Sequence, residues 1–295
     1  MIVVSKCKLV IDIGGTSVKG AIFKEETLTD RRNFDSPKSW DDMASALDNM
    51  ITSYLEEHEV EAISFSVPGI ANQQTGEIDG ASSLHYLHGF PFLQHFKTTY
   101  KLPVFFENDA NCACHAEVAA GAAKGARNVI FIIIGTGIGG SIVMNGEFVS
   151  GANNFAGEFG MMLTEDNEEW SVTGSAVHMA RAYSKEVGQV TSGKEVFDRA
   201  ESGEALALSY VDTLYLSLAK GLYNLQYILD PEYIVVGGGI SNKPNLLEKL
   251  EEKMAIVMGY GQRCPIRPTL VTSFYKNDAN LIGAGLLADK GLTKQ

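Results

Sequence analysis

The sequence has little of what several other protein classes require. Of its 295 residues only 8 are proline and 4 are cysteine, and 24 Lys and Arg stand against 36 Asp and Glu, a net charge of −12. Few prolines and a hydrophobic fraction of 45% exclude a disordered or collagen-like chain. The shortage of basic residues argues against non-specific binding to DNA, RNA or anionic lipid.

Cysteines and long apolar runs are also scarce. The cysteines are Cys7, Cys112, Cys114 and Cys264, and their spacing does not resemble a disulfide framework. The most apolar run, residues 129–134, has the length of a strand and is too short for a signal peptide or a membrane span. We therefore expect a cytoplasmic protein in a reducing compartment, without a membrane partner.

Glycine, in contrast, is abundant, with 30 residues, and several glycines directly follow predicted strands. Apolar patterning predicts strands over 9–13, 18–23, 62–67, 103–106, 128–134, 141–144, 147–149, 233–236 and 269–271. It predicts helices after Ser39 and over 110–123, 180–187, 205–229, 245–257 and 279–290. The strand-to-helix order runs twice, which indicates two α/β lobes. We expect an N-terminal lobe of residues 1–123 with a C-terminal helix at about 279–295, and a C-terminal lobe of 124–278.

Two glycine-rich stretches resemble well-known nucleotide motifs. Residues 135–140, GTGIGG, satisfy the dinucleotide pattern G-x-G-x-x-G, but a strand and an Asn-Gly hairpin are predicted after them. A dinucleotide-binding turn opens a helix, so this interpretation is rejected. Residues 188–194 resemble a P-loop, but Glu195 replaces the Ser or Thr that binds Mg²⁺, and a helix is predicted before them.

The remaining glycine turns lie in two strand–turn–strand hairpins, at residues 13–16 and 134–137. Backbone N–H groups and a Thr hydroxyl in such turns can surround phosphate oxygens. Each turn alone could be an ordinary tight hairpin that needs the conformational freedom of glycine. Two similar turns, one in each predicted lobe, favour a phosphate ligand.

Five motifs in a fixed order carry a more specific signal. They are IDIGGT at 11–16, ENDAN at 107–111, GTGIGG at 135–140, AGEFG at 156–160 and VVGGGI at 235–240. Together they resemble the ROK family of sugar kinases and sugar-responsive repressors over about residues 9–287. The resemblance implies an α/β fold with two ribonuclease H-like lobes of the actin/hexokinase superfold and a cleft between them. It also implies ATP-dependent phosphorylation of a hexose-type sugar, at the 6-hydroxyl, by a homodimer.

The same resemblance assigns roles to individual residues. Asp109 is the expected catalytic base, which accepts the proton of the sugar hydroxyl. The residues expected on the sugar are Asn108, Glu158, Glu169 and Gly69. Those expected on ATP are Asp12, Gly14, Gly15, Thr16, Gly135, Thr136, Gly137, Gly237 and Gly238. Asp12 is also expected to hold Mg²⁺ through water.

Simpler structural roles remain open for some of these residues. Asp109 could cap the helix that follows it, and Asn108 could be a turn residue. Glu158 could be a solvated loop carboxylate, and Glu169 belongs to the acidic run 165–169, which is typical of a solvated surface. The ENDAN motif has an echo at 276–280, KNDAN, where we expect Asp278 to be a helix N-cap rather than a catalytic residue.

The sequence departs from the family at the expected zinc site. Met161 stands where most members have a zinc-binding His, and residues 162–174 contain no cysteine. Zn²⁺ prefers imidazole and thiolate ligands, so zinc is expected to be absent. Without that His, and with Ser83 where Asn is usual, we expect a pocket that accepts a sugar substituted at the anomeric oxygen or at C2. Glucose, β-glucosides, mannose and N-acetylmannosamine are the candidate acceptors.

The competing class is a sugar-responsive regulator. Repressors of the family carry a DNA-binding segment before the first glycine hairpin, whereas a strand is predicted here from about Leu9, so we expect no nucleic-acid partner. A non-catalytic sugar sensor remains the alternative. Asp12 and Asp109, which such a sensor would not need, favour the kinase.

Overall fold

The structure is a computed structural model and describes residues 6–80, 82–165, 167–260 and 265–293, so Cys264 lies outside the described residues. The chain divides into two compact units. Unit 1 comprises Met1–Glu117 and Asn277–Gln295, and unit 2 comprises Val118–Lys276. The first and last parts of the sequence therefore share one unit.

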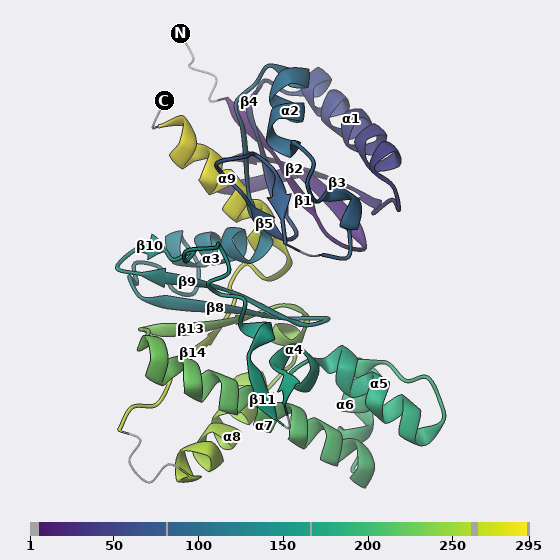
Figure 1. Cartoon of the computed structure of the whole chain (residues 1–295), viewed down its shortest axis with the longest axis vertical. Helices are drawn as coiled ribbons and strands as arrows, with labels where there is room; N and C mark the ends of the chain where they lie inside the picture. The colour runs from purple at the N-terminus through teal and green to yellow at the C-terminus, as the bar shows by residue number, and fades with distance from the viewer. Residues whose placement is uncertain (1–5, 81, 166, 261–264, 294–295) are drawn as a thin grey trace. The chain divides into compact units, whose positions relative to one another are not determined.

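Unit 1 is built on a five-stranded sheet in the order β3-β2-β1-β4-β7 (Figure 1). Its strands are β1 (Cys7–Ile13), β2 (Ser17–Lys24), β3 (Thr27–Asp35), β4 (Val60–Val67) and β7 (Val104–Asn108). The first three form an antiparallel meander, whereas β1, β4 and β7 run parallel. Parallel strands end at the same edge of a sheet, so the residues that follow β1, β4 and β7 come together.

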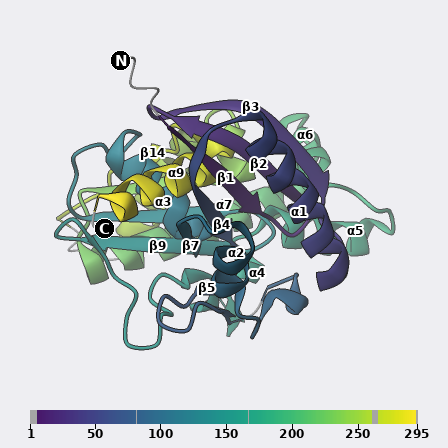
Figure 2. The same ribbon diagram turned by 90° about the horizontal axis from the view of Figure 1, so that it is seen from above.

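Helices cover both faces of this sheet, as Figure 2 shows. They are α1 (Trp40–Glu57), α2 (Phe92–Tyr100), α3 (Asp109–Ala119) and α9 (Ala279–Leu292), with the short elements β5 (Ile70–Ala71), β6 (Ile78–Asp79) and η1 (His85–Leu87). Leu47 of α1 and Phe96 of α2 belong to the core that includes alternate residues of β1 and β4. On the other face α9 approaches so closely that a Cβ on Gly285 would lie 2.3 Å from the ring of Phe23.

Unit 2 repeats the pattern with a sheet in the order β10-β9-β8-β13-β14. Its strands are β8 (Val129–Ile134), β9 (Ile138–Met144), β10 (Glu147–Phe148), β13 (Tyr233–Gly237) and β14 (Leu270–Thr272). An antiparallel hairpin, β8–β9, again adjoins strands that run parallel, β8, β13 and β14. The glycine turn after β8 and the glycines that end β13 therefore reach the same edge.

The helices of unit 2 lie on one side of its sheet (Figure 1). They are α4 (Trp170–Thr173), α5 (Ala176–Val187), α6 (Gly193–Glu201), α7 (Ala205–Leu229) and α8 (Leu246–Tyr260), with η2 (Phe159–Met161), β11 (Leu163–Glu165), β12 (Glu168–Glu169) and η3 (Gly239–Asn242) as short elements. The short element η4 (Lys276–Asp278) lies where the chain passes from unit 2 back to unit 1. Alternate strand residues, such as Ile132 and Val236, belong to the same hydrophobic core as Leu218 and Leu222 of α7. A membrane-crossing helix is not found in the part of the chain that the structure describes.

Several local predictions are confirmed. Ser39 caps α1 by accepting a hydrogen bond from the Asp42 amide. Asn145 and Gly146, with φ of 55° and 84°, form the hairpin turn between β9 and β10, which needs two residues with positive φ. The P-loop-like stretch ends one helix and starts the next: Gly188 terminates α5, and Ser192 with Glu195 forms a capping box on α6.

Other local predictions are wrong or only partly right. The helix predicted to reach residue 123 ends at Ala119. The N-cap position predicted for Asp278 is right, since Asp278 is the N-cap residue of α9, but its side chain makes no capping hydrogen bond; its Oδ2 accepts one from the guanidinium of Arg31 at 2.7 Å. Strand β3 was not predicted. It lies at the sheet edge, and its alternating exposed residues include Arg31 and Asn33, with the half-buried Asp30 and Arg32 between and beside them, so its composition lacks the apolar pattern of a strand.

Candidate functional site

Asp12 lies near the end of β1 and is only 6% exposed. Oδ1 accepts hydrogen bonds from Ser66 Oγ at 2.7 Å and from Asn280 Nδ2 at 2.9 Å. Oδ2 has the ammonium of Lys19 at 3.9 Å. Two donors on one oxygen fix the orientation of the carboxylate and leave Oδ2 as its less engaged oxygen. Ser66 and Asn280 could not be predicted as partners of Asp12, because neither forms a recognisable glycine or carboxylate pattern with it.

Asn108 and Asp109 follow at the end of β7, two strands away from Asp12. Asn108 Nδ2 donates to Asp109 Oδ1 at 3.0 Å and to the carbonyl of Gly69 at 2.8 Å. Asp109 Oδ1 also accepts from the amide of Ala110 at 2.8 Å, at the start of α3. Unit 1 thus brings together Gly69, Asn108 and Asp109, three residues predicted to contact the sugar or its reacting hydroxyl.

Position 69 requires glycine for two reasons, the conformation of its backbone and the lack of space for a side chain. Its φ of +83° is in the region that favours glycine, and an added Cβ would lie 2.8 Å from the carbonyl oxygen of Asp79. The carbonyl of Gly69 accepts from Asn108, so the turn after β4 orients the amide that precedes the predicted base.

Glu107, the first residue of the ENDAN motif, accepts hydrogen bonds from two residues that follow it in the motif. Its Oε1 accepts from the Asn108 amide at 2.7 Å and from Asn111 Nδ2 at 3.0 Å. Burial raises the pKa of the Glu107 carboxyl, and these two donors partly oppose that shift. The ENDAN motif predicts no role for Glu107 itself, whereas in the structure Glu107 binds the backbone of Asn108 and the side chain of Asn111.

The first glycine turn joins β1 to β2, as predicted. The Gly14 amide donates to the carbonyl of Ser17 at 3.0 Å, and the Gly14 carbonyl accepts from Ser36 Oγ at 2.6 Å. Gly15 and Thr16 are exposed at the tip, and a Cβ on Gly15 would lie 2.4 Å from Ser83 Oγ. Hydrogen bonds thus hold Gly14 at the base of the turn, whereas the tip of the turn is accessible to a ligand.

The second glycine turn, residues 135–137, is followed by β9, as predicted, and not by a helix. The Gly135 amide donates to the Gly137 carbonyl at 2.9 Å, and Thr136 is exposed. Gly238, with φ of +81°, packs so tightly below this turn that a Cβ would lie 2.4 Å from the Ile134 carbonyl oxygen. Unit 2 thus brings the glycines after β8 and β13 together.

A cavity of about 660 Å³ opens beside these glycines. Its lining includes Gly135, Val177, Phe197, Ile240 and Lys243. The ammonium of Lys243 lies 4.2 Å from the centre of the Phe197 ring and forms an ion pair with a Glu201 oxygen at 2.9 Å. Apolar walls beside accessible backbone amides suit a ligand with a flat ring and an anionic tail.

Glu158 lies in unit 2, in a segment that is packed tightly onto β9. A Cβ on Gly157 would lie 2.9 Å from the Gly140 carbonyl oxygen, and one on Gly160 would lie 2.1 Å from that of Ile138. Burial raises the pKa of the Glu158 carboxyl. The segment therefore holds a partly desolvated acid in a defined place, which does not fit a freely solvated loop carboxylate.

Met161 and Glu169 lie near this segment in the sequence and have exposed side chains. Met161 is 59% exposed, at the end of η2. Glu169 precedes α4 and makes no capping hydrogen bond. The next residue, Trp170, is fully buried and donates from its indole nitrogen to the Ser217 carbonyl at 3.2 Å. Trp170 thus anchors the backbone next to Glu169.

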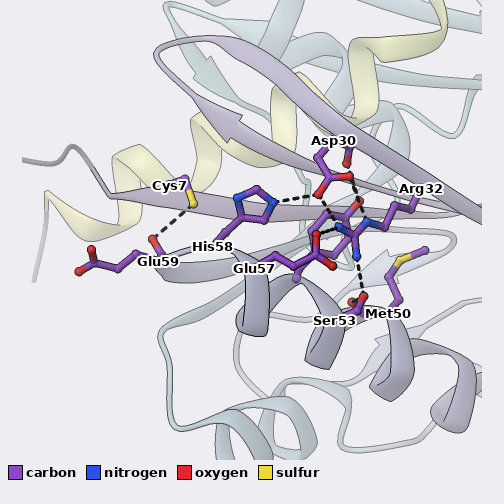
Figure 3. A network of polar contacts seen from close by, with 9 residues as sticks. Cys7, Asp30, Arg32, Met50, Ser53, Glu57, His58 and Glu59 are labelled. Carbon is purple, nitrogen blue, oxygen red and sulfur yellow. Dashed lines mark hydrogen bonds and ion pairs between the residues drawn. The ribbon is translucent and has the colours of Figure 1, made fainter.

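A separate group of metal-ligating side chains lies in unit 1, where Asp30, Glu57 and His58 place one ligand atom each within 4.8 Å of one another. Figure 3 shows the guanidinium of Arg32 among them. It donates to both carboxylate oxygens of Asp30, at 3.0 and 2.6 Å, and to Glu57 at 2.6 Å. Arg32 lowers the pKa of the Asp30 carboxyl. The arginine already pairs with both acids, so the group forms an ion-pair network.

A family model described as ROK family matches residues 8–291. The chain belongs to the ROK family. This ROK chain is 32% identical over 285 residues to a beta-glucoside kinase from Listeria monocytogenes serovar 1/2a, covering 92% of this chain and 94% of that protein.

Solved structures agree with this assignment. The structure of a ROK family protein from Streptococcus pneumoniae TIGR4 in complex with sucrose is 32% identical, with a TM-score of 0.89, and the match covers 98% of this chain and 100% of that one. A ROK family glucokinase from Streptomyces griseus, solved with glucose and AMPPNP, is 24% identical, with a TM-score of 0.83, and shares the fold. The match covers 97% of this chain and 100% of that one. The predicted α/β fold of the actin/hexokinase type is confirmed.

Proposed function

We propose that this ROK protein is an ATP-dependent sugar kinase in which Asp109 is the general base. The observation that carries the proposal is the arrangement of Asp109 and Asn108 beside Gly69, where the parallel strands of unit 1 end. A sugar hydroxyl needs an oriented acceptor for its proton when it attacks phosphorus. The amide of Asn108 orients the Asp109 carboxylate through Oδ1, and Oδ2 is the oxygen that takes the proton.

Asp12 fits the role predicted for it toward Mg²⁺. Its Oδ1 is engaged by Ser66 and Asn280, so Oδ2 is the oxygen that would face the ion, directly or through water. Mg²⁺ usually keeps several waters and needs only one or two carboxylates together with substrate phosphates. When bound, the ion neutralises charge on the phosphates. The exposed tip of the Gly14–Thr16 turn lies one residue beyond the end of β1, close to Asp12 in sequence.

The nucleotide is assigned to unit 2. The cavity beside Gly135 and Gly239 has an apolar wall for the base, from Val177, Phe197 and Ile240. The turn at 135–137 supplies backbone amides for the phosphates, which explains how a protein with a net charge of −12 can hold an anion. We propose that no zinc is needed, because residues 162–174 contain no cysteine and Met161 replaces the expected histidine.

For the acceptor we propose a hexose with a substituent at its anomeric oxygen or at C2. Glu158 provides a carboxylate for sugar hydroxyls, and the exposed thioether of Met161 provides an apolar surface near it in the chain. The relative named beta-glucoside kinase supports a β-glucoside, the first of these acceptors. Glu169, which is exposed, is assigned to the same sugar.

The test is a coupled assay of ADP release with ATP, Mg²⁺ and a panel of glucose, cellobiose, mannose and N-acetylmannosamine. We expect a higher kcat/KM for a substituted sugar than for glucose, and a clear preference for glucose would contradict the acceptor class. Asp109→Asn is expected to lower kcat by about 10²–10⁴-fold, the range of general base catalysis. The matched control is Asp278→Asn, in the echo of the same motif, which should retain activity because Asp278 pairs with Arg31 on the surface of unit 1.

The alternative, a non-catalytic sugar sensor, predicts a different outcome. It would bind sugar, measured by calorimetry, without releasing ADP, and Asp109→Asn would then have no turnover to lose. Sugar-dependent turnover that survives Asp109→Asn would show instead that the base is another residue.

A further inference from the structure

Ser175, in unit 2, contacts the second glycine turn, although it lies 40 and 39 residues further along the chain than the two residues it binds. Its hydroxyl is fully buried and is shared between the carbonyl oxygens of Gly135 at 3.1 Å and Thr136 at 2.7 Å. Ser175 Oγ also accepts from the Val177 amide at 3.2 Å, as the N-cap of α5. One hydroxyl therefore connects the turn to the start of a helix.

Ser171 of α4 contacts the same turn at its other end. Its Oγ accepts from the Ile138 amide at 3.0 Å. The fit is close, because a Cβ on Gly137 would lie 3.0 Å from this oxygen, and one on Gly160 would lie 2.2 Å from it. The turn is thus held at Gly135 and Thr136 by one serine and at Ile138 by another.

These contacts determine where the amides of the turn point. A trans peptide is planar, and its N–H points away from the carbonyl that precedes it. When Ser175 binds the carbonyls of Gly135 and Thr136, the N–H groups of Thr136 and Gly137 must point in the opposite direction. In the part of the chain that the structure describes, neither N–H donates to a protein acceptor. Two aligned donors of this kind form an anion-binding concavity.

We propose that Ser175, assisted by Ser171, is a positioning residue that directs the Thr136 and Gly137 amides toward the phosphates of the nucleotide. The inference rests on the proposed kinase function and deepens it. Ser175 also links the two parts of the nucleotide site, because Ala176 and Val177, the first residues of the helix that it caps, line the cavity beside the turn.

The test is Ser175→Ala, with nucleotide and sugar followed separately. We expect the Kd for AMPPNP, measured by calorimetry, and the KM for ATP to rise about tenfold, since one hydroxyl with two acceptors is lost. The KM for the sugar should stay within about twofold, a change below the typical contribution of one hydrogen bond. Ser175→Thr keeps the hydroxyl and should restore most of the nucleotide affinity.

The matched control is Ser39→Ala, which removes another N-cap serine, that of α1 in unit 1. It should lower the thermal stability without changing the Kd for AMPPNP. An unchanged Kd in folded Ser175→Ala would overturn the inference. If Ser175→Ala does not fold, Ser171→Ala takes its place with the same expected loss, and an unchanged Kd would again overturn it. A wild-type protein that does not bind AMPPNP would instead refute the proposed function, and the inference with it.

Discussion

Asn280 donates a hydrogen bond from Nδ2 to Oδ1 of Asp12 over 2.9 Å, although 268 positions separate the two residues. Asn280 lies in the first turn of α9, which packs on β1, β4 and β7. With Ser66, it fixes the carboxylate that we assign to Mg²⁺. The last helix of the chain therefore completes a site that begins at the first strand.

Replacing Asn280 should impair turnover more than folding. Asn280→Ala removes a donor to a buried carboxylate, and hydrogen bonds to charged groups contribute about 1.5–3 kcal/mol, so kcat should fall about ten- to a hundredfold. The measurement is sugar-dependent ADP release at saturating substrates. Asn277→Ala is the control, because Asn277 is exposed and close in sequence. Equal kcat values for both variants would contradict the role of Asn280.

The raised pKa of Glu158 predicts that this residue lowers the stability at neutral pH. Burial favours its neutral form, so its contribution is most favourable below the unfolded-state pKa of about 4.3 and is lost as the pH rises through the folded-state pKa. Glu158→Gln should therefore be more stable than the wild type in urea at about pH 7, and the difference should shrink at about pH 4. The same variant should lose sugar affinity.

The control for that experiment is Glu168→Gln, at an exposed position of β12. It should alter the pH dependence of unfolding less than Glu158→Gln does. A Glu158→Gln protein that unfolds more easily than the wild type at neutral pH would show that the carboxylate stabilises the fold.

Gly221 of α7 should be intolerant of any side chain. A Cβ there would lie 2.1 Å from the ring of Trp170, which is fully buried and anchors the backbone next to Glu169. Gly221→Ala should cost about 1–3 kcal/mol through overpacking. Gly259→Ala, in α8, meets no atom within 4 Å and should gain up to about 1 kcal/mol from helix propensity. Urea unfolding of both variants measures the contrast, and equal stabilities would contradict it.

Met161 should influence the choice of acceptor. Met161→His replaces an exposed thioether by a polar ring, and a changed pocket contact is worth about 1–3 kcal/mol, so the ratio of kcat/KM for cellobiose to that for glucose should fall about tenfold. Val190→His places the same ring at a position that is 93% exposed, between α5 and α6, and should leave the ratio unchanged. A ratio that Met161→His does not alter would remove Met161 from the site.

Much of the fold could be predicted because the signals are local. Buried strands appear as short apolar runs, and the 25 residues of α7 were predicted with their bounds. Strand β3 could not be predicted, since its sheet-edge position demands no apolar pattern. The turn before it contains Glu25 and Glu26 with φ of 50° and 59°, residues that do not signal positive φ as Asn-Gly does.

The sequence by itself determined the glycine turns, the Asn108–Asp109 pair and the departure at Met161, because these features are contiguous and chemically distinctive. Only the tertiary structure could decide what holds them in place. The donors Ser66, Asn280, Ser171 and Ser175 are common residue types, distant in the chain from the groups they bind. A serine or asparagine carries no sign of its partner, because a hydrogen bond between distant residues depends on how the sheets and helices pack and not on the neighbouring sequence.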